Sequence, residues 1–121
     1  MKEIERWKFG EKNDYLIDLV LQGKKTATTS IYNKDYKNHK YSIICYSNGQ
    51  DACKIKTKKI IKMKFKDMTW DLAQLEGENN SLLDWKSQHE KFFKIINKNF
   101  NEDTIIEFEI FELVEIYNRK N

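Results

Sequence analysis

Proline is absent from this sequence, and only four glycines, two cysteines and two histidines occur among its 121 residues. Most turns must therefore lean on asparagine and aspartate as well as glycine. The cysteines and histidines are scattered, without the close pairs that a zinc site requires. We expect no metal and no cofactor. Cys45 and Cys53 should be reduced and buried, with a disulfide between them as the alternative.

Long apolar runs are also missing. No stretch approaches the roughly 20 residues of a membrane-spanning helix, and residues 1–6 lack the apolar segment of a secretory signal. The net charge of +3 is too small to require a nucleic-acid partner. The length is typical of one domain. Residues 1–121 therefore predict a single cytoplasmic domain with no membrane association, and the sequence leaves its oligomeric state open.

Hydrophobic periodicity predicts short helices inserted among antiparallel strands. Alternation of apolar and polar residues indicates strands, and apolar residues three and four apart indicate helices. Strands are expected at 41–46, 52–66 and 105–117, and helices at 14–22, at 69–76 and from Ser81 onward. Strands and helices do not alternate as they do in parallel βαβ folds. The predicted fold class is α+β, mainly β: a small mixed or antiparallel β-barrel with two or three helices.

The helix ends carry recognisable signals. Asp14, Thr69 and Ser81 are expected N-caps, and Gly23 and Gly77 are expected to end helices in the left-handed conformation. Six residues of the last helix fall at helical spacing and predict its buried face; they are Leu82, Trp85, His89, Phe92, Phe93 and Ile96.

Residues 52–66 show the clearest strand pattern, with lysines at even positions facing away from an apolar face. A row of lysines could bind a phosphate backbone, and this interpretation assigns nucleic-acid contacts to Lys54, Lys56, Lys62 and Lys64. The alternative is a solvated face whose lysines pair across strands with the acidic segment 105–117. The residues alone leave both interpretations open.

The segment from Gly23 to Ser30 places two lysines and four hydroxyl side chains together, directly after a predicted helix end. A threonine hydroxyl is a weak nucleophile and needs an adjacent base. Lysine can serve as that base only after it has lost its proton, which burial and a neighbouring positive charge both favour. This pattern is compatible with a catalytic turn. The residues alone favour the alternative, an ordinary helix end with lysines facing the negative end of the helix dipole.

The same segment resembles the signature turn of the ASCH domain, a relative of the PUA-like barrels. The resemblance covers residues 21–28 and extends to 7–10, to 72–78, to the helix that contains Trp85 and His89, and to 108–114. It therefore spans most of the chain in the order and spacing of that family. It implies a PUA-like barrel and a role connected with RNA or nucleosides.

One branch of that family hydrolyses the acetyl amide of N4-acetylcytidine with a lysine base, a threonine nucleophile and a glutamate proton donor. Carried over by position, the resemblance assigns these roles to Lys25, Thr28 and Glu76. A proton would stay on Glu76 if burial removed its carboxyl group from water. The resemblance also implies substrate contacts, which are assigned to Lys24, Thr26, Trp85 and His89.

Two departures from the acetylcytidine branch affect the choice of substrate. Ser30 stands where that branch has an arginine, and residues 38–46 differ from its usual sequence before and after the first long strand. The leading hypothesis is therefore a small amidohydrolase that acts on an acylated nucleoside. The alternatives are a non-catalytic RNA- or nucleotide-binding module and a ribonuclease.

Overall fold

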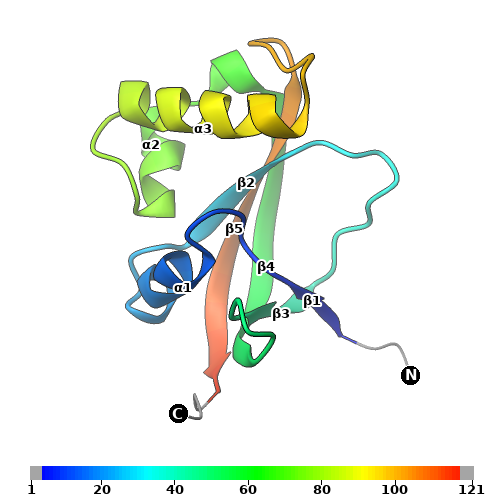
Figure 1. Ribbon diagram of the computed structural model, residues 1–121, viewed down its shortest axis with the longest axis vertical. Coiled ribbons are helices and arrows are strands. Elements are labelled where there is room, and N and C mark those ends of the chain that lie inside the picture. Colours follow the sequence, from blue (N-terminus) through cyan, green and yellow to red (C-terminus); the bar gives the residue numbers. More distant parts are fainter. Residues whose placement is uncertain (1–3, 118–121) are drawn as a thin grey trace.

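The computed structural model describes residues 4–117 and consists of one sheet with helices at its side and end (Figure 1). The strands and helices, in chain order, are β1 (Glu5–Trp7), α1 (Asn13–Leu21), β2 (Ala27–Ile31), β3 (Tyr41–Cys45), β4 (Asp51–Lys64), α2 (Trp70–Ala73), α3 (Leu82–Ile96) and β5 (Ile105–Ile116). Two 3₁₀ turns, η1 (Phe65–Asp67) and η2 (Gln74–Glu76), flank α2.

Within residues 4–117, five strands form one curled sheet in the order β1-β3-β4-β5-β2. β1 runs parallel to β3, and the other neighbouring pairs are antiparallel. The long strands β4 and β5 form the centre of this half-barrel. The predicted fold class, a mixed, mainly β structure with helices, is therefore confirmed, although the sheet is curled and not a closed barrel.

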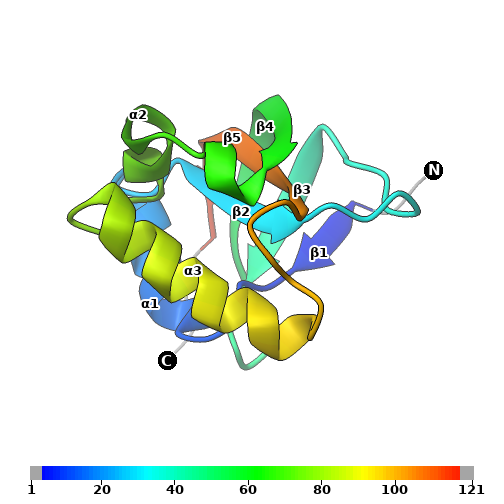
Figure 2. The same ribbon diagram turned by 90° about the horizontal axis from the view of Figure 1, so that it is seen from above.

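Two apolar clusters hold the helices against the sheet. The larger cluster joins β2 and β5 to α2 and α3, and the fully buried Phe108 and Trp85 lie within it. The smaller cluster packs α1 on β3, β4 and β5 through Ile17, Ile44 and Phe111. Figure 2, seen from above, shows α3 running beside the strands and in front of α1.

The predicted helix ends are mostly confirmed. The Ser81 side chain accepts a hydrogen bond from the backbone N–H of Asp84 and caps α3. Gly23 and Gly77 both adopt positive φ angles, as predicted for residues that end a helix. The expected cap at Asp14 is wrong, because α1 begins one residue earlier, after Lys12. The Asp14 carboxylate instead accepts hydrogen bonds from Ser47 in the β3–β4 turn.

Three further predictions concern individual side chains. Ile96 was expected on the buried face of α3, but it lies in the last turn beyond the sheet and is 61% exposed. Thr69 makes no side-chain cap hydrogen bond at the start of α2. Both cysteines are buried and free, as expected.

Some lysines of β4 lie opposite glutamates of β5. Lys54 is in register with Glu115, and Lys62 with Glu107. Lys59 and Lys64 lie opposite isoleucines. Cross-strand neighbours of opposite charge stabilise a sheet modestly. This register fits the interpretation of a solvated face with compensating charges. The assignment of nucleic-acid contacts to Lys54, Lys56, Lys62 and Lys64 stays a prediction.

The larger apolar cluster yields a prediction about stability. Phe108→Ala should lower the free energy of unfolding by about 3–5 kcal/mol, because it opens a cavity in a closely packed core. Leu83→Ala, at a side chain that is 80% exposed, is the control, and it should change that free energy by less than about 0.5 kcal/mol. Urea titration followed by circular dichroism measures both. Equal midpoints for the two variants would contradict the placement of Phe108 in the core.

Candidate functional site

The site is assembled where the turn after η2 rests on the chain that enters β2. The backbone N–H of Thr26 donates to the carbonyl oxygen of Leu75 at 2.8 Å, and its hydroxyl donates to the same oxygen at 3.1 Å. Gly77 has a φ of +73°, and a Cβ at this position would collide with the carbonyl group of Lys24. A glycine is therefore required for the two segments to approach this closely.

This approach buries Lys25 between two carboxylates. The Lys25 Nζ lies 3.3 Å from Glu76 Oε1 and 2.6 Å from Glu78 Oε2. The side chains of Lys25 and Glu76 are 1% and 2% exposed, and that of Glu78 is 13% exposed. The ring of Phe9 lies against the same amine, 5.3 Å from the Nζ. A buried ammonium group needs such partners, since desolvation of an unpaired charge is costly.

Glu76 accepts hydrogen bonds from three further directions. The Thr29 hydroxyl donates to Glu76 Oε2 at 2.6 Å, and the Trp85 indole N–H donates to the same oxygen at 2.9 Å. His89 Nε2 lies 3.3 Å from Glu76 Oε1, and its Nδ1 lies 2.8 Å from the Trp85 carbonyl oxygen. The carboxylate is therefore the centre of the hydrogen-bond network, with partners from β2 and α3.

The surroundings of Glu76 hold it in the ionised form. Burial raises the pKa of its carboxyl group, but the Lys25 charge and the hydrogen bonds from His89 and Thr29 outweigh burial, and they lower the pKa to about 2. The expectation that Glu76 keeps a proton is therefore wrong, because burial comes with hydrogen-bond donors on both of its oxygens. Glu78 has a single contact of this kind, with Lys25, and it is more exposed.

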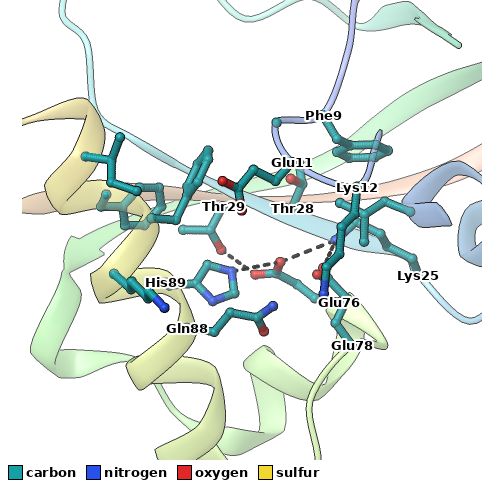
Figure 3. Close-up of a pocket in the computed structure, with 16 residues that line it drawn as sticks. Phe9, Glu11, Lys12, Lys25, Thr28, Thr29, Glu76, Glu78, Gln88 and His89 are labelled. Carbon is teal, nitrogen blue, oxygen red and sulfur yellow. Dashed lines mark hydrogen bonds and ion pairs between the residues drawn. The ribbon is translucent and has the colours of Figure 1, made fainter. Parts of the chain in front are cut away.

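A cavity of about 410 Å³ opens beside this network. Its walls come from the loop after β1, from β2, from the turn at 76–78 and from α3. The Thr28 and Thr29 side chains line it together with Lys25, Glu76 and Glu78 (Figure 3). Among the residues that the structure describes, no side chain or backbone group forms a hydrogen bond with the Thr28 hydroxyl. This hydroxyl is therefore available to a ligand.

The structure gathers some of the sequence-predicted site residues and separates others. Lys25, Thr28, Glu76 and His89 all line the cavity. Three others, Lys24, Thr26 and Trp85, are not among its lining residues.

Each of these three has a physical reason for its place outside the cavity. Trp85 is fully buried, with its ring stacked between Phe65 and His89, so its indole supports Glu76 and has no face for a ligand. The Thr26 hydroxyl is occupied by the Leu75 carbonyl group. Lys24 is exposed on the chain before β2.

Sequence reasoning missed most of the lining residues, among them Phe9, Thr29, Glu78 and Gln88. Thr29 and Glu78 lie within or beside the quoted motifs, and the Glu-Gly-Glu pattern around Gly77 offered two carboxylates. The spacing did not indicate that Glu76 would have hydrogen-bond partners on both oxygens while Glu78 has a single contact and is more exposed. Phe9 and Gln88 reach the cavity only through the packing of distant segments.

The described residues limit what else the site contains. In residues 4–117, no group of three or more His, Cys, Asp or Glu side chains is arranged to hold a metal ion. Within the same part of the chain, every helix is too short or too polar to cross a bilayer.

This curled half-barrel with its helices has the PUA-like fold. Within this fold class, the family model of the ASCH domain matches residues 5–115, and this chain belongs to the ASCH domain family. No curated protein has a matching sequence.

The solved structures similar to this one include the following two. Protein EF3133 from Enterococcus faecalis V583 is 29% identical with a TM-score of 0.83, over 100% of this chain and 86% of that chain. The ASCH domain from Lactobacillus crispatus JV V101 is 23% identical with a TM-score of 0.84, over 93% of this chain and 80% of that chain. The second likeness concerns the fold alone.

The close approach at Gly77 can be tested with a matched pair of substitutions. Gly77→Ala and Gly49→Ala both place a side chain at a positive φ angle, but only the first meets backbone atoms. Gly49→Ala should cost about 1–2 kcal/mol of unfolding free energy, the usual cost of left-handed backbone. Gly77→Ala should cost clearly more, as measured by chemical denaturation. Equal losses would show that the Gly77 turn can move away from Lys24 freely.

The ionised state of Glu76 makes stability depend on pH. Because its folded pKa lies below the ordinary value of 4.5, its contribution is present above about pH 4.5 and is lost as the pH falls toward about 2. Glu76→Gln removes this titration but keeps a side chain of similar shape. The wild type should therefore lose more unfolding free energy than Glu76→Gln over that interval. Parallel slopes in denaturation at several pH values would disprove the ionised state.

Proposed function

We propose that this protein is a small amidohydrolase that releases the acyl group from an acylated nucleoside such as N4-acetylcytidine. The observation that carries the proposal is the buried Lys25 amine, flanked by Glu76 and Glu78, in the cavity that the free Thr28 hydroxyl also lines. An amide hydrolase without a metal needs a nucleophile, a base for that nucleophile and a proton donor for the leaving amine. These four side chains supply the three groups.

In the proposed reaction, Lys25 becomes a base by passing its proton to Glu78 along their 2.6 Å contact. The neutral amine then takes the proton of the Thr28 hydroxyl, and the Thr28 oxygen forms a bond with the acyl carbon. The bond from that carbon to the nucleoside nitrogen breaks, and the nitrogen takes its proton from Glu78. The products of this step are the free nucleoside and an ester on Thr28.

Water completes the cycle. It gives a proton to Glu78 and attacks the ester carbon, and the released Thr28 oxygen recovers its proton from the Lys25 ammonium. Lys25 is then neutral and Glu78 carries the proton. Return of this proton along their contact restores the Lys25 ammonium and the Glu78 carboxylate. The family resemblance assigns the role of proton donor to Glu76. We assign this role to Glu78 instead, because Glu76 accepts hydrogen bonds on both oxygens and stays ionised. Glu76 instead holds Lys25 and His89 in position.

Binding of RNA or a nucleotide without catalysis, and ribonuclease activity, stay alternatives. The first would use the same cavity, with the lysines of β4 as additional contacts. Their position opposite β5 glutamates, such as Lys62 opposite Glu107, reduces the positive field that a phosphate backbone would meet. The amidohydrolase proposal accounts for the buried amine, which a simple binding surface does not need.

Acetate release from N4-acetylcytidine tests the proposal. Thr28→Val should lower turnover by roughly three orders of magnitude or more, the scale of losing a nucleophile. Thr28→Ser should retain measurable turnover, since it keeps a hydroxyl group. Ser30→Ala, at an exposed residue of the same strand, should leave turnover unchanged. Thermal melting would establish that each variant is folded.

Two outcomes would overturn the proposal. One is the absence of acetate release by the folded wild type, and the other is full activity in Thr28→Val.

A further inference from the structure

Gln88 on α3 presents one defined end of its side-chain amide to the cavity. It lies one residue before His89 and lines the same space. Its carbonyl oxygen Oε1 accepts a hydrogen bond from Asn79 Nδ2 at 2.6 Å. Figure 3 shows the amide nitrogen of Gln88 turned toward the cavity and its oxygen turned away. The end that a ligand meets is therefore a donor.

The orientation of Asn79 is itself fixed. Its Nδ2 also donates to Asp84 Oδ2 at 2.9 Å, and a carboxylate can only accept. The two hydrogens of Nδ2 are thus divided between Asp84 and Gln88. Asp84 is held by the start of α3, where its backbone N–H donates to the Ser81 hydroxyl at 3.1 Å. A series of hydrogen bonds therefore leads from the cap of α3 through Asp84 and Asn79 to Gln88. It determines which atom of the Gln88 amide faces a ligand.

Several polar groups of the cavity are already paired within the protein. Lys25, Glu76, Thr29 and His89 form hydrogen bonds with one another or with their neighbours. The lining also contains the charged side chains of Glu11, Lys12 and Lys91. Among the described residues, no acceptor forms a hydrogen bond with Gln88 Nε2, so this donor and the Thr28 hydroxyl are two neutral groups that a ligand can meet. The two lie on different walls, α3 and β2. If the carbonyl group that reacts lies at Thr28, a different part of the same ligand therefore contacts Gln88.

We propose that Gln88 is a specificity-determining residue that donates a hydrogen bond to the carbonyl oxygen of a pyrimidine-type base, as at O2 of cytidine. The proposal rests on the proposed function for the class of ligand. A fixed amide donor favours a carbonyl oxygen and disfavours an amino group at the same place, because two donors cannot pair. Asn79 is the positioning residue that fixes this polarity.

Binding of two nucleosides tests the inference without any turnover. Cytidine carries an acceptor at position 2 of the ring, and isocytidine carries an amino group there. The wild type should bind cytidine more tightly than isocytidine in calorimetry or NMR titration. Gln88→Glu replaces the donor with an acceptor of the same shape, and the ratio of the two dissociation constants should shift toward isocytidine by roughly tenfold or more.

Three further variants separate polarity from shape. Gln88→Met keeps the volume but has no donor, so it should weaken cytidine binding without favouring isocytidine. Asn79→Ala frees the Gln88 amide to turn over, and the ratio should move toward one. Ser87→Ala, at the exposed neighbouring residue of α3, should leave the ratio unchanged. In the wild type, the side-chain amide signals of Gln88 should shift when cytidine is added.

The outcomes distinguish this inference from the proposed function. An unchanged ratio in Gln88→Glu, or no binding of cytidine by the wild type, overturns the role of Gln88. Failure to release acetate from N4-acetylcytidine, together with the expected change of ratio, overturns the amidohydrolase activity and leaves Gln88 as a specificity residue of a binding site.

Discussion

The buried ion pair between Lys25 and Glu76 is the interaction on which the rest of the site depends. Two charges removed from water are tolerated only when their attraction is joined by further hydrogen bonds. Glu76 obtains these from β2 and α3, through Thr29 and Trp85. Lys25 obtains a second carboxylate from Glu78. The positions of the strand, the turn and the helix are therefore coupled through a single carboxylate.

The sheet and the Gly77 turn make this pairing possible. β2 is held along β5 from Ala27 to Ile31, so the backbone that carries Lys25 enters from a rigid edge. The turn can approach it because Gly77 has no side chain to meet Lys24. The carboxylates on both sides of Gly77 then reach the same amine. Side chains that are supported in this way keep a fixed geometry, which catalysis and selective binding both require.

The sequence predicts local features of this protein better than it predicts side-chain partners. The Ser81 cap, the Gly77 turn and the alternation along β4 all follow from short-range rules, and the structure has them. The different contacts of Glu76 and Glu78 involve Lys25 and Thr29, which are between 47 and 53 positions away along the chain. The burial of Trp85 depends on how α3 packs into the larger apolar cluster. No rule based on sequence spacing specifies whether Glu76 or Glu78 accepts the hydrogen bond from Thr29 in β2.

The energetic cost of this arrangement is itself informative about function. An apolar cluster of similar volume would hold β2 against α3 at least as well, since buried ion pairs contribute little net stability. The chain instead places a lysine and two glutamates at the wall of a cavity, beside a threonine hydroxyl without a partner. One carboxylate is saturated with donors and keeps its charge, while the other has one contact and faces the cavity. Buried ionisable groups gathered at the wall of a cavity are typical of functional sites, and packing alone gives no reason for them.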